Sequence, residues 1–350
     1  METFRIDVPQ AALDDLHDRL DRTRWPSEIP GADWDYGVPG RYVRELADRW
    51  RHGYDWRRTE ARLNAYEQWK TVIDGQPIHF LHVRSAAPDA LPLILTHGWP
   101  GSVAEFLDVI EPLREHFHLV VPSLPGFGFS GPTAERGWNV ARIARAWAEL
   151  MRRLGYRRYG AAGNDWGSTI SPQIARIAPE SVVGVHVTQV WTEPDGPIDD
   201  PTPEERAALD NHAWLAEHMN AYGMVQMQQP QSLAYALTDS PAGLLGWHCL
   251  IYREGVDADY VLDNVSIHWL TGTAGSAMRI YREFLLEPPL EWPSRVPVAY
   301  AQFADDYQPI RRLAPALAQW NKYDTGGHYS AVQTPALLVK DLTDFFTGLK

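Results

Sequence analysis

The chain has 350 residues, of which 45% are hydrophobic and 22% charged, and its formal net charge is −13 at pH 7. This composition is typical of a globular protein large enough for one catalytic domain and an accessory unit, and the negative charge without a basic patch argues against nucleic acid and anionic membranes as partners. The single cysteine, Cys249, excludes an intrachain disulfide and a thiolate metal cluster and fits a reducing compartment.

The N-terminal segment is charged from its first residues and carries no signal-peptide hydrophobic region. No segment approaches the roughly 18 consecutive apolar residues that cross a bilayer, so we expect a soluble, cytoplasmic protein. Leu13, Leu16 and Leu20 recur at helical spacing and predict a helix after Pro9. A second helix is predicted over residues 41–50. Because two short helices cannot bury their apolar faces alone, we expect them to pack onto a larger body.

From about residue 71 the pattern changes to short apolar strands that alternate with helices. The segment 71–83 predicts a β-hairpin around Asp74-Gly75. The later apolar runs are typical of strands that are buried on both faces. Further strands are predicted at 91–97, 117–122, 159–162, 182–187 and 296–303, and helices at 140–154 and 337–346. Their alternation predicts a mostly parallel central sheet with helices on both faces.

Between residues 196 and 290 the alternation stops and helical patterns replace it. A helical insertion between two late strands is typical of a cap over the active-site edge of such a sheet. We therefore divide the chain into a helical N-terminal domain (1–70), a first core part (71–195), a cap (196–290) and a second core part (291–350).

The segment from Gly163 through Asp165 to Gly167 follows a predicted strand and precedes a helix. Small residues two positions before and after Asp165 allow a sharp strand-to-helix turn, which presents the central side chain above the sheet as a nucleophile. A carboxylate in this place displaces a leaving group from sp³ carbon and forms an alkyl ester, which water can then attack. This chemistry suits strained epoxides and haloalkanes.

Two further turns complete the predicted site. The turn after His97 is expected to aim the backbone amide of Trp99 at a developing oxyanion, together with the amide of Trp166.

His328 precedes the last predicted helix, and the order of nucleophile, acid and histidine along the chain matches a nucleophile-elbow enzyme. We expect His328 to deprotonate the water that attacks the ester. Two acids follow the preceding strand and are candidates to orient the histidine. Asp306 is preferred, and Asp305 stays open as the alternative.

These segments together resemble the microsomal-type epoxide hydrolase family of the α/β-hydrolases, and in particular its soluble bacterial members. The resemblance covers nearly the whole chain and is carried by residues 4–69, His97-Gly98-Trp99-Pro100, residues 122–130, Asp165-Trp166-Gly167 and Gly326-Gly327-His328. It implies an α/β-hydrolase fold with a mostly parallel central sheet, a helical cap insertion and an N-terminal segment that wraps the core.

The resemblance also implies two cap tyrosines that donate hydrogen bonds to the epoxide oxygen. Tyr222, eight residues before Pro230, matches the first of them, and Tyr281 matches the second. Ring opening generates an alkoxide, which a neutral phenol can bind and then protonate. The implied reaction needs neither a metal nor an organic cofactor.

The sequence departs from the family pattern in three active-site loops. Asn164 stands where the family usually has glycine, and Tyr329 stands where the family usually has phenylalanine. The loop that begins at Phe303 differs in its next residue and in its spacing, which is why the choice between Asp305 and Asp306 stays open. None of these changes removes a required functional group.

The sequence therefore predicts an epoxide hydrolase that converts a small apolar epoxide and water to a vicinal diol. One alternative is a haloalkane dehalogenase, in which the Trp166 indole would bind the halide. Another is a non-catalytic binding protein that has kept the fold. The sequence leaves the oligomeric state open and is compatible with a homodimer.

Overall fold

The computed structural model describes residues 1–293 and 295–349, and its centre is a nine-stranded sheet in the order β1-β2-β3-β5-β4-β6-β7-β8-β9. The strands from β1 to β5 in this order pair antiparallel, and all pairs from β5 to β9 are parallel. The predicted mostly parallel sheet is thereby confirmed. The strands are β1 (Glu2–Phe4), β2 (Gln68–Ile73), β3 (Gln76–Val83), β4 (Leu91–Thr96), β5 (Phe117–Pro122), β6 (Tyr159–Gly163), β7 (Val182–Val187), β8 (Val298–Gln302) and β9 (Gln319–Lys322).

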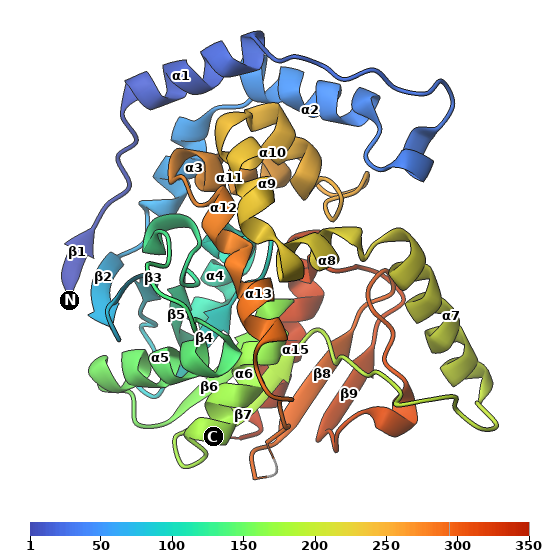
Figure 1. Cartoon of the computed structure of the whole chain (residues 1–350). Coiled ribbons are helices and arrows are strands. Elements are labelled where there is room, and N and C mark those ends of the chain that lie inside the picture. The colour runs from blue at the N-terminus through green and yellow to red at the C-terminus, as the bar shows by residue number, and fades with distance from the viewer. Residues whose placement is uncertain (294, 350) are drawn as a thin grey trace.

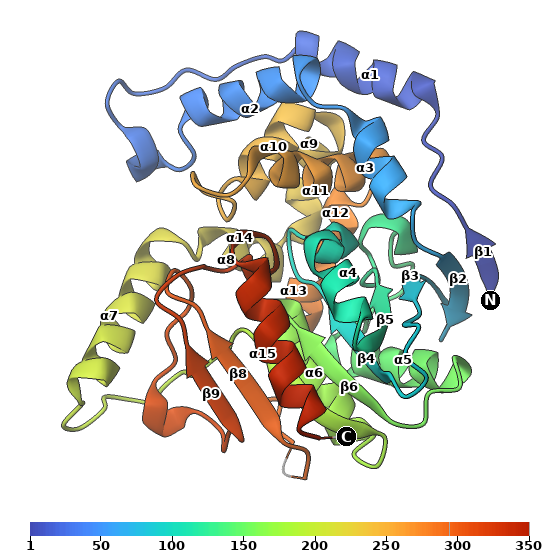
Figure 2. The same ribbon diagram turned by 180° about the vertical axis from the view of Figure 1, so that it is seen from behind.

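Helices cover both faces of this sheet. On one face lie α5 (Val140–Arg153) and α6 (Trp166–Ile177) (Figure 1), and on the other lie α4 (Leu107–Arg114) and α15 (Pro335–Thr347) (Figure 2). Successive side chains of a strand point to opposite faces, so an unbroken apolar run feeds two cores. In β4, Ile94 belongs to one hydrophobic cluster, whereas Leu93 and Leu95 belong to the other.

The predicted helical insertion lies between β7 and β8. Its helices are α7 (Pro203–His218), α8 (Ala221–Gln228), α9 (Pro230–Asp239), α10 (Pro241–His248), α11 (Ala258–Leu270), α12 (Ala274–Ala277) and α13 (Arg279–Leu285). The first of them begins with a capping box, in which the Thr202 and Glu205 side chains each accept from the other residue's backbone amide. We refer to this insertion as the cap.

Of the N-terminal helices, α1 and α2 run across the cap at the top of Figure 1, and α3 lies below them beside the cap. They are α1 (Gln10–Asp21), the 3₁₀ turn η1 (Asp33–Tyr36), α2 (Gly40–His52) and α3 (Trp56–Leu63). Leu16, Leu20 and Trp50 share one buried cluster with Leu244 and Val265 of the cap. The expectation that these helices pack onto a larger body is therefore confirmed.

The Trp50 indole is also fastened by a polar contact. Its Nε1 donates a 2.9 Å hydrogen bond to Oγ of Ser266 in the cap.

The elements that lie outside the predicted ones include β1, α3, α4 and β9. β1 and β9 are short and partly exposed, and neither has an apolar run. α3 is rich in arginine, and its first turn is capped by the Asp55 side chain. The predicted domain boundary at residue 70 falls within β2, which pairs with β1.

The remaining short elements are η2 (Val103–Phe106), η3 (Gly128–Ser130), η4 (Arg311–Leu313) and α14 (Ser330–Gln333). Among the described residues, the helices are all too short or too polar to cross a membrane.

Candidate active site

Asp165 lies at the sharp turn between β6 and α6. Its backbone has φ 52° and ψ −118°, a left-handed conformation that a residue with a side chain rarely adopts. The flanking glycines permit this turn. A Cβ on Gly163 would lie 2.4 Å from the Gly167 carbonyl, and a Cβ on Gly167 would lie 1.9 Å from the Thr96 carbonyl oxygen. The predicted nucleophile turn is therefore present, and only glycine fits on either side of it.

The loop after β4 approaches the Asp165 carboxylate closely. The amide of Trp99 donates a 2.8 Å hydrogen bond to Asp165 Oδ1, and the Trp166 amide also faces the carboxylate. A Cβ on Gly98 would lie 2.1 Å from the same Oδ1, so this position too requires glycine. Both predicted oxyanion amides therefore face the Asp165 carboxylate, and the Trp99 amide bonds to Oδ1.

His328 lies between two carboxylates. Its Nδ1 is 3.1 Å from Asp306 Oδ1, and its Nε2 is 3.6 Å from Asp165 Oδ2. Asp305 is exposed, and its backbone amide bonds to the Gly326 carbonyl, which holds the acid loop beside the histidine loop. Of the two acids that the sequence leaves open, the structure thus brings Asp306 to His328 and turns Asp305 to the surface.

The charges at this site oppose the effect of burial. Burial alone would lower the pKa of His328, but the carboxylates of Asp306, Asp165 and Glu105 raise that pKa to about 9. Burial raises the pKa of Asp165, while the charge of His328 and the two amides act in the opposite direction. The neighbouring carboxylates therefore favour a protonated imidazolium of His328 in the resting protein.

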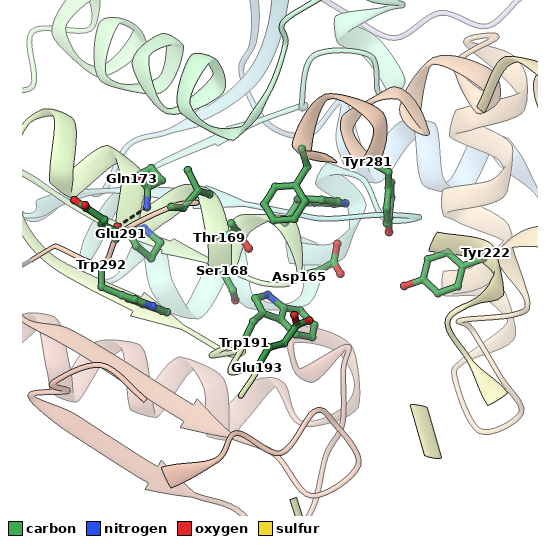
Figure 3. A pocket seen from close by; sticks show the side chains of 14 residues that line it. Asp165, Ser168, Thr169, Gln173, Trp191, Glu193, Tyr222, Tyr281, Glu291 and Trp292 are labelled. Atoms are coloured by element: carbon green, nitrogen blue, oxygen red, sulfur yellow. Dashed lines mark hydrogen bonds between the residues drawn. The ribbon is translucent and has the colours of Figure 1, made fainter. Parts of the chain in front are cut away.

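Tyr222 on α8 and Tyr281 on α13 face Asp165 from the cap, and Figure 3 shows both hydroxyls directed toward the space in front of the carboxylate. Tyr222 stacks on Trp99, with ring centroids 5.1 Å apart, and Tyr281 meets Trp166 edge-on at 4.8 Å. Burial raises the pKa of each phenol above its ordinary value, so both stay neutral donors at physiological pH.

A cavity of about 340 Å³ opens in front of Asp165. Thr169, Pro172 and Gln173 form its floor on one face of α6, and Figure 3 shows the cavity reaching Trp292 at its far end. Its remaining lining is largely aromatic and apolar and includes Trp166, Trp191, Tyr222, Tyr281, Phe284 and Leu290.

The sequence and the fold of this chain are similar to those of known proteins. Residues 1–106 match the family described as "Epoxide hydrolase N terminus", and residues 91–290 match the "alpha/beta hydrolase fold" family. A "Putative epoxide hydrolase" of Stigmatella aurantiaca (strain DW4/3-1) is 41% identical over 99% of this chain and 85% of its own length. This chain belongs to the epoxide hydrolase family. The predicted family and the predicted α/β-hydrolase fold are thereby confirmed.

Other epoxide hydrolases are similar over the same extent. "Juvenile hormone epoxide hydrolase 1" of Ctenocephalides felis is 31% identical over 99% of this chain and 85% of its own length. The solved structure of Aspergillus niger epoxide hydrolase superposes with a TM-score of 0.88 at 28% identity, over 100% of this chain and 96% of that one. The N-terminal segment, the core and the cap therefore all have counterparts in this family.

In this epoxide hydrolase, two buried polar residues near the carboxylates lie outside the sequence prediction. Glu105, in η2, accepts a 2.8 Å hydrogen bond from Asn164 Nδ2, and burial raises its pKa to about 8. Gln189, which follows β7, contacts Asp306. A signal for each exists in the sequence, because both are polar residues within apolar runs at the ends of strands or the start of a helix. Local pattern alone does not say which side chains they meet.

Proposed function

We propose that this protein hydrolyses apolar epoxides to vicinal diols through an alkyl ester on Asp165. The observation that carries the proposal is the surrounding of that carboxylate. Two neutral phenols face it from the cap, a charged imidazole faces it from the core, and the Trp99 backbone amide bonds to its Oδ1. This arrangement supplies a group for each of three tasks, namely ring opening, ester hydrolysis and stabilisation of the oxyanion.

In the first half-reaction, Tyr222 and Tyr281 donate hydrogen bonds to the epoxide oxygen. Asp165 Oδ1 is engaged by the Trp99 amide, so Oδ2 is the oxygen available for attack. A bond forms between Oδ2 and a ring carbon as the bond from that carbon to the epoxide oxygen breaks. The oxygen leaves as an alkoxide and takes a proton from a tyrosine hydroxyl.

Ester formation then changes the charge that His328 experiences. The ester is neutral, so one of the carboxylates that raise the pKa of His328 is lost and that pKa falls. The imidazolium gives up its proton, which can return to the tyrosinate. The neutral ring, held by Asp306, can now act as a base. Formation of the intermediate itself thus prepares the base for the second half-reaction.

In the second half-reaction, His328 takes a proton from water as the water oxygen attacks Cγ of Asp165. The negative charge that develops on Oδ1 is stabilised by the amides of Trp99 and Trp166. Collapse of this intermediate breaks the bond between Cγ and Oδ2, and His328 returns the proton to Oδ2 as it departs. The diol therefore leaves with Oδ2, and the water oxygen takes its place in the Asp165 carboxylate.

The substrate class follows from the cavity. From Asp165, at the N-terminal end of α6, to Gln173 on its floor the cavity follows eight residues, about 12 Å at 1.5 Å per residue. Aromatic and aliphatic side chains form most of the lining, which favours an elongated apolar substituent on the epoxide. We propose epoxides with an extended aryl or alkyl group as substrates.

Turnover in H₂¹⁸O tests the proposal. Over repeated turnovers, ¹⁸O is expected to enter the Asp165 side chain, because water attacks its carbonyl carbon and not the epoxide. Label that appears in the diol from the first turnover, with none in Asp165, would exclude the ester. Halide release from chloroalkanes without diol formation from epoxides would favour the dehalogenase alternative.

Two expectations from the sequence stay predictions. We propose a cytoplasmic location, on the basis of the single cysteine. The homodimer with which the sequence is compatible is tested by light scattering of the purified protein.

A further inference from the structure

Asn164 and Gln189 belong to a buried hydrogen-bonded group that surrounds the back of the nucleophile turn. Its other members are Glu105, Ser168 and Thr188, and the side chains of all five are buried. We call these five residues the elbow network.

Gln189 uses both ends of its amide in this network. Its Oε1 accepts from the backbone amide of Asp165 at 2.6 Å and from the Ser168 hydroxyl at 2.9 Å. Its Nε2 donates to Asn164 Oδ1 at 2.8 Å and to Oδ2 of Asp306. One side chain thus joins the backbone of the nucleophile to the acid that contacts the histidine.

The remaining contacts fix which end of the amide points where. The Asp165 backbone amide can only donate, so the Gln189 atom that faces it is the oxygen, and Gln189 Nε2 faces Asn164 Oδ1. Asn164 Nδ2 in turn donates to Glu105. The Thr188 hydroxyl donates to the same Asn164 Oδ1. A flipped Gln189 would put its oxygen against two acceptors and its NH₂ against the Asp165 amide, and would lose these bonds.

The contact with Asp306 completes the coordination of that carboxylate. Oδ1 faces His328 and accepts from the Tyr307 amide at 2.7 Å, while Oδ2 accepts from Gln189. Without this second donor the carboxylate could rotate away from His328, and its buried oxygen would lack a partner. The Asp165 amide would lose its acceptor at the same time.

We propose that Gln189, oriented by Asn164, is a positioning residue that holds Asp306 and the Asp165 backbone in register for ester hydrolysis. The inference rests on the proposed function, since it concerns its second half-reaction. A glutamine that merely fills the core would affect stability, whereas a positioning residue affects the hydrolysis step and its dependence on pH.

Two substitutions separate these possibilities. Q189L removes every hydrogen bond of the side chain, and misplacement of His328 and its acid should slow ester hydrolysis by about 10²-fold at all pH values. Ring opening should change much less, because the cap tyrosines are not in the network. Q189E keeps an acceptor for the Asp165 amide but replaces the donor to Asp306 with a titratable group.

The Q189E variant carries the sharper test. Burial and the adjacent Asp306 should raise the pKa of the introduced carboxyl group. At low pH this group is protonated and can still donate to Asp306, so hydrolysis should approach the wild-type rate. As pH rises it ionises and repels Asp306, and the hydrolysis rate should fall about tenfold per pH unit. Neither the wild type nor Q189L should show this descending limb.

The measurement is single-turnover kinetics over a pH series, with indole fluorescence reporting ester formation and its decay. Gln76, a buried glutamine in the β2–β3 hairpin that bonds to the Ser130 carbonyl, supplies matched controls. Q76L and Q76E should lose stability without altering the hydrolysis rate or its pH profile. If Q189L does not fold, Q189E alone decides, since its effect is pH-dependent within one protein.

Normal ester hydrolysis in Q189L, or a Q189E profile parallel to that of the wild type, would overturn the inference. Failure of the proposed function has a different signature, because the wild type itself would then form no ester. A further result would also contradict the inference: the rates of ring opening and hydrolysis fall equally in Q189L, and the hydrolysis rate of Q189E does not fall as pH rises. Gln189 would then have a structural role only.

Discussion

Asp165 lies between a cap wall and a core wall of different chemistry. The cap wall consists of Tyr222 and Tyr281, which are held mainly by ring contacts with Trp99 and Trp166. The core wall consists of His328, Asp306 and the elbow network, which are held by hydrogen bonds in series.

The two walls differ in how their side chains are held, and this difference suits the different requirements of the two half-reactions. A phenol packed between rings can follow an oxygen that moves about its ring carbon as the epoxide opens. A water molecule must instead be aimed at one carbon atom, and a hydrogen-bonded network holds the base in a single orientation. The cap wall should therefore govern ester formation, and the core wall should govern ester hydrolysis. Variants of each wall can break or sharpen this assignment.

The largest effect is expected at Asp165, which both walls serve. Asp165→Asn should lower diol formation by about 10⁴-fold or more, because both half-reactions lose the group that carries the intermediate. The assay should follow purification at once, with mass spectrometry to detect any deamidation back to aspartate. Full turnover by protein that is still asparagine would contradict the mechanism.

His328→Gln should stop the reaction midway. Without a base, ester hydrolysis should slow by about 10³-fold or more, while ring opening continues. The acid-quenched protein should then gain the mass of one substrate molecule. A variant that neither turns over nor gains mass would place His328 in the first half-reaction as well.

The converse pattern is expected for the cap wall. Tyr222→Phe combined with Tyr281→Phe removes both phenolic donors and leaves the rings in place, and should slow ester formation by about 10²- to 10⁴-fold. Each single substitution should cost less, because one donor remains. Decay of ester already formed should be unchanged, and a slower decay would show that the two walls are not independent.

The smallest expected effect is the dependence of stability and of ester hydrolysis on pH through His328. The pKa of His328 is raised from 6.5 to about 9 in the resting protein, so its stabilising contribution is complete below pH 6.5 and is lost as pH rises through 9. The melting temperature of the wild type should fall over this range relative to His328→Gln. Ester hydrolysis should rise with pH to a plateau with an apparent pKa below 9, since the ester no longer carries the Asp165 charge. If the apparent pKa of ester hydrolysis stays at about 9, the Asp165 charge contributes little to the raised pKa of His328.

Local sequence was sufficient for the parts of the site that lie on one turn of the chain. The strand-to-helix turn at Asp165 follows from glycines at fixed offsets, because any side chain there would meet backbone atoms. Apolar runs were likewise sufficient for the parallel strands, since a strand buried on both faces needs no particular neighbour. The positions of Tyr222 and Tyr281 came from the family resemblance, as many tyrosines have similar local surroundings.

Only the tertiary structure decided which side chains from distant segments contact one another in the site. Asp305 and Asp306 are adjacent in the sequence, and the pairing of their loop with Gly327 determines which of them reaches His328. Gln189, Asn164 and Glu105 come from three separate segments, and no short-range pattern reports that they share hydrogen bonds. Residue type and spacing therefore determined which groups are available, whereas packing between distant segments determined which of them act together.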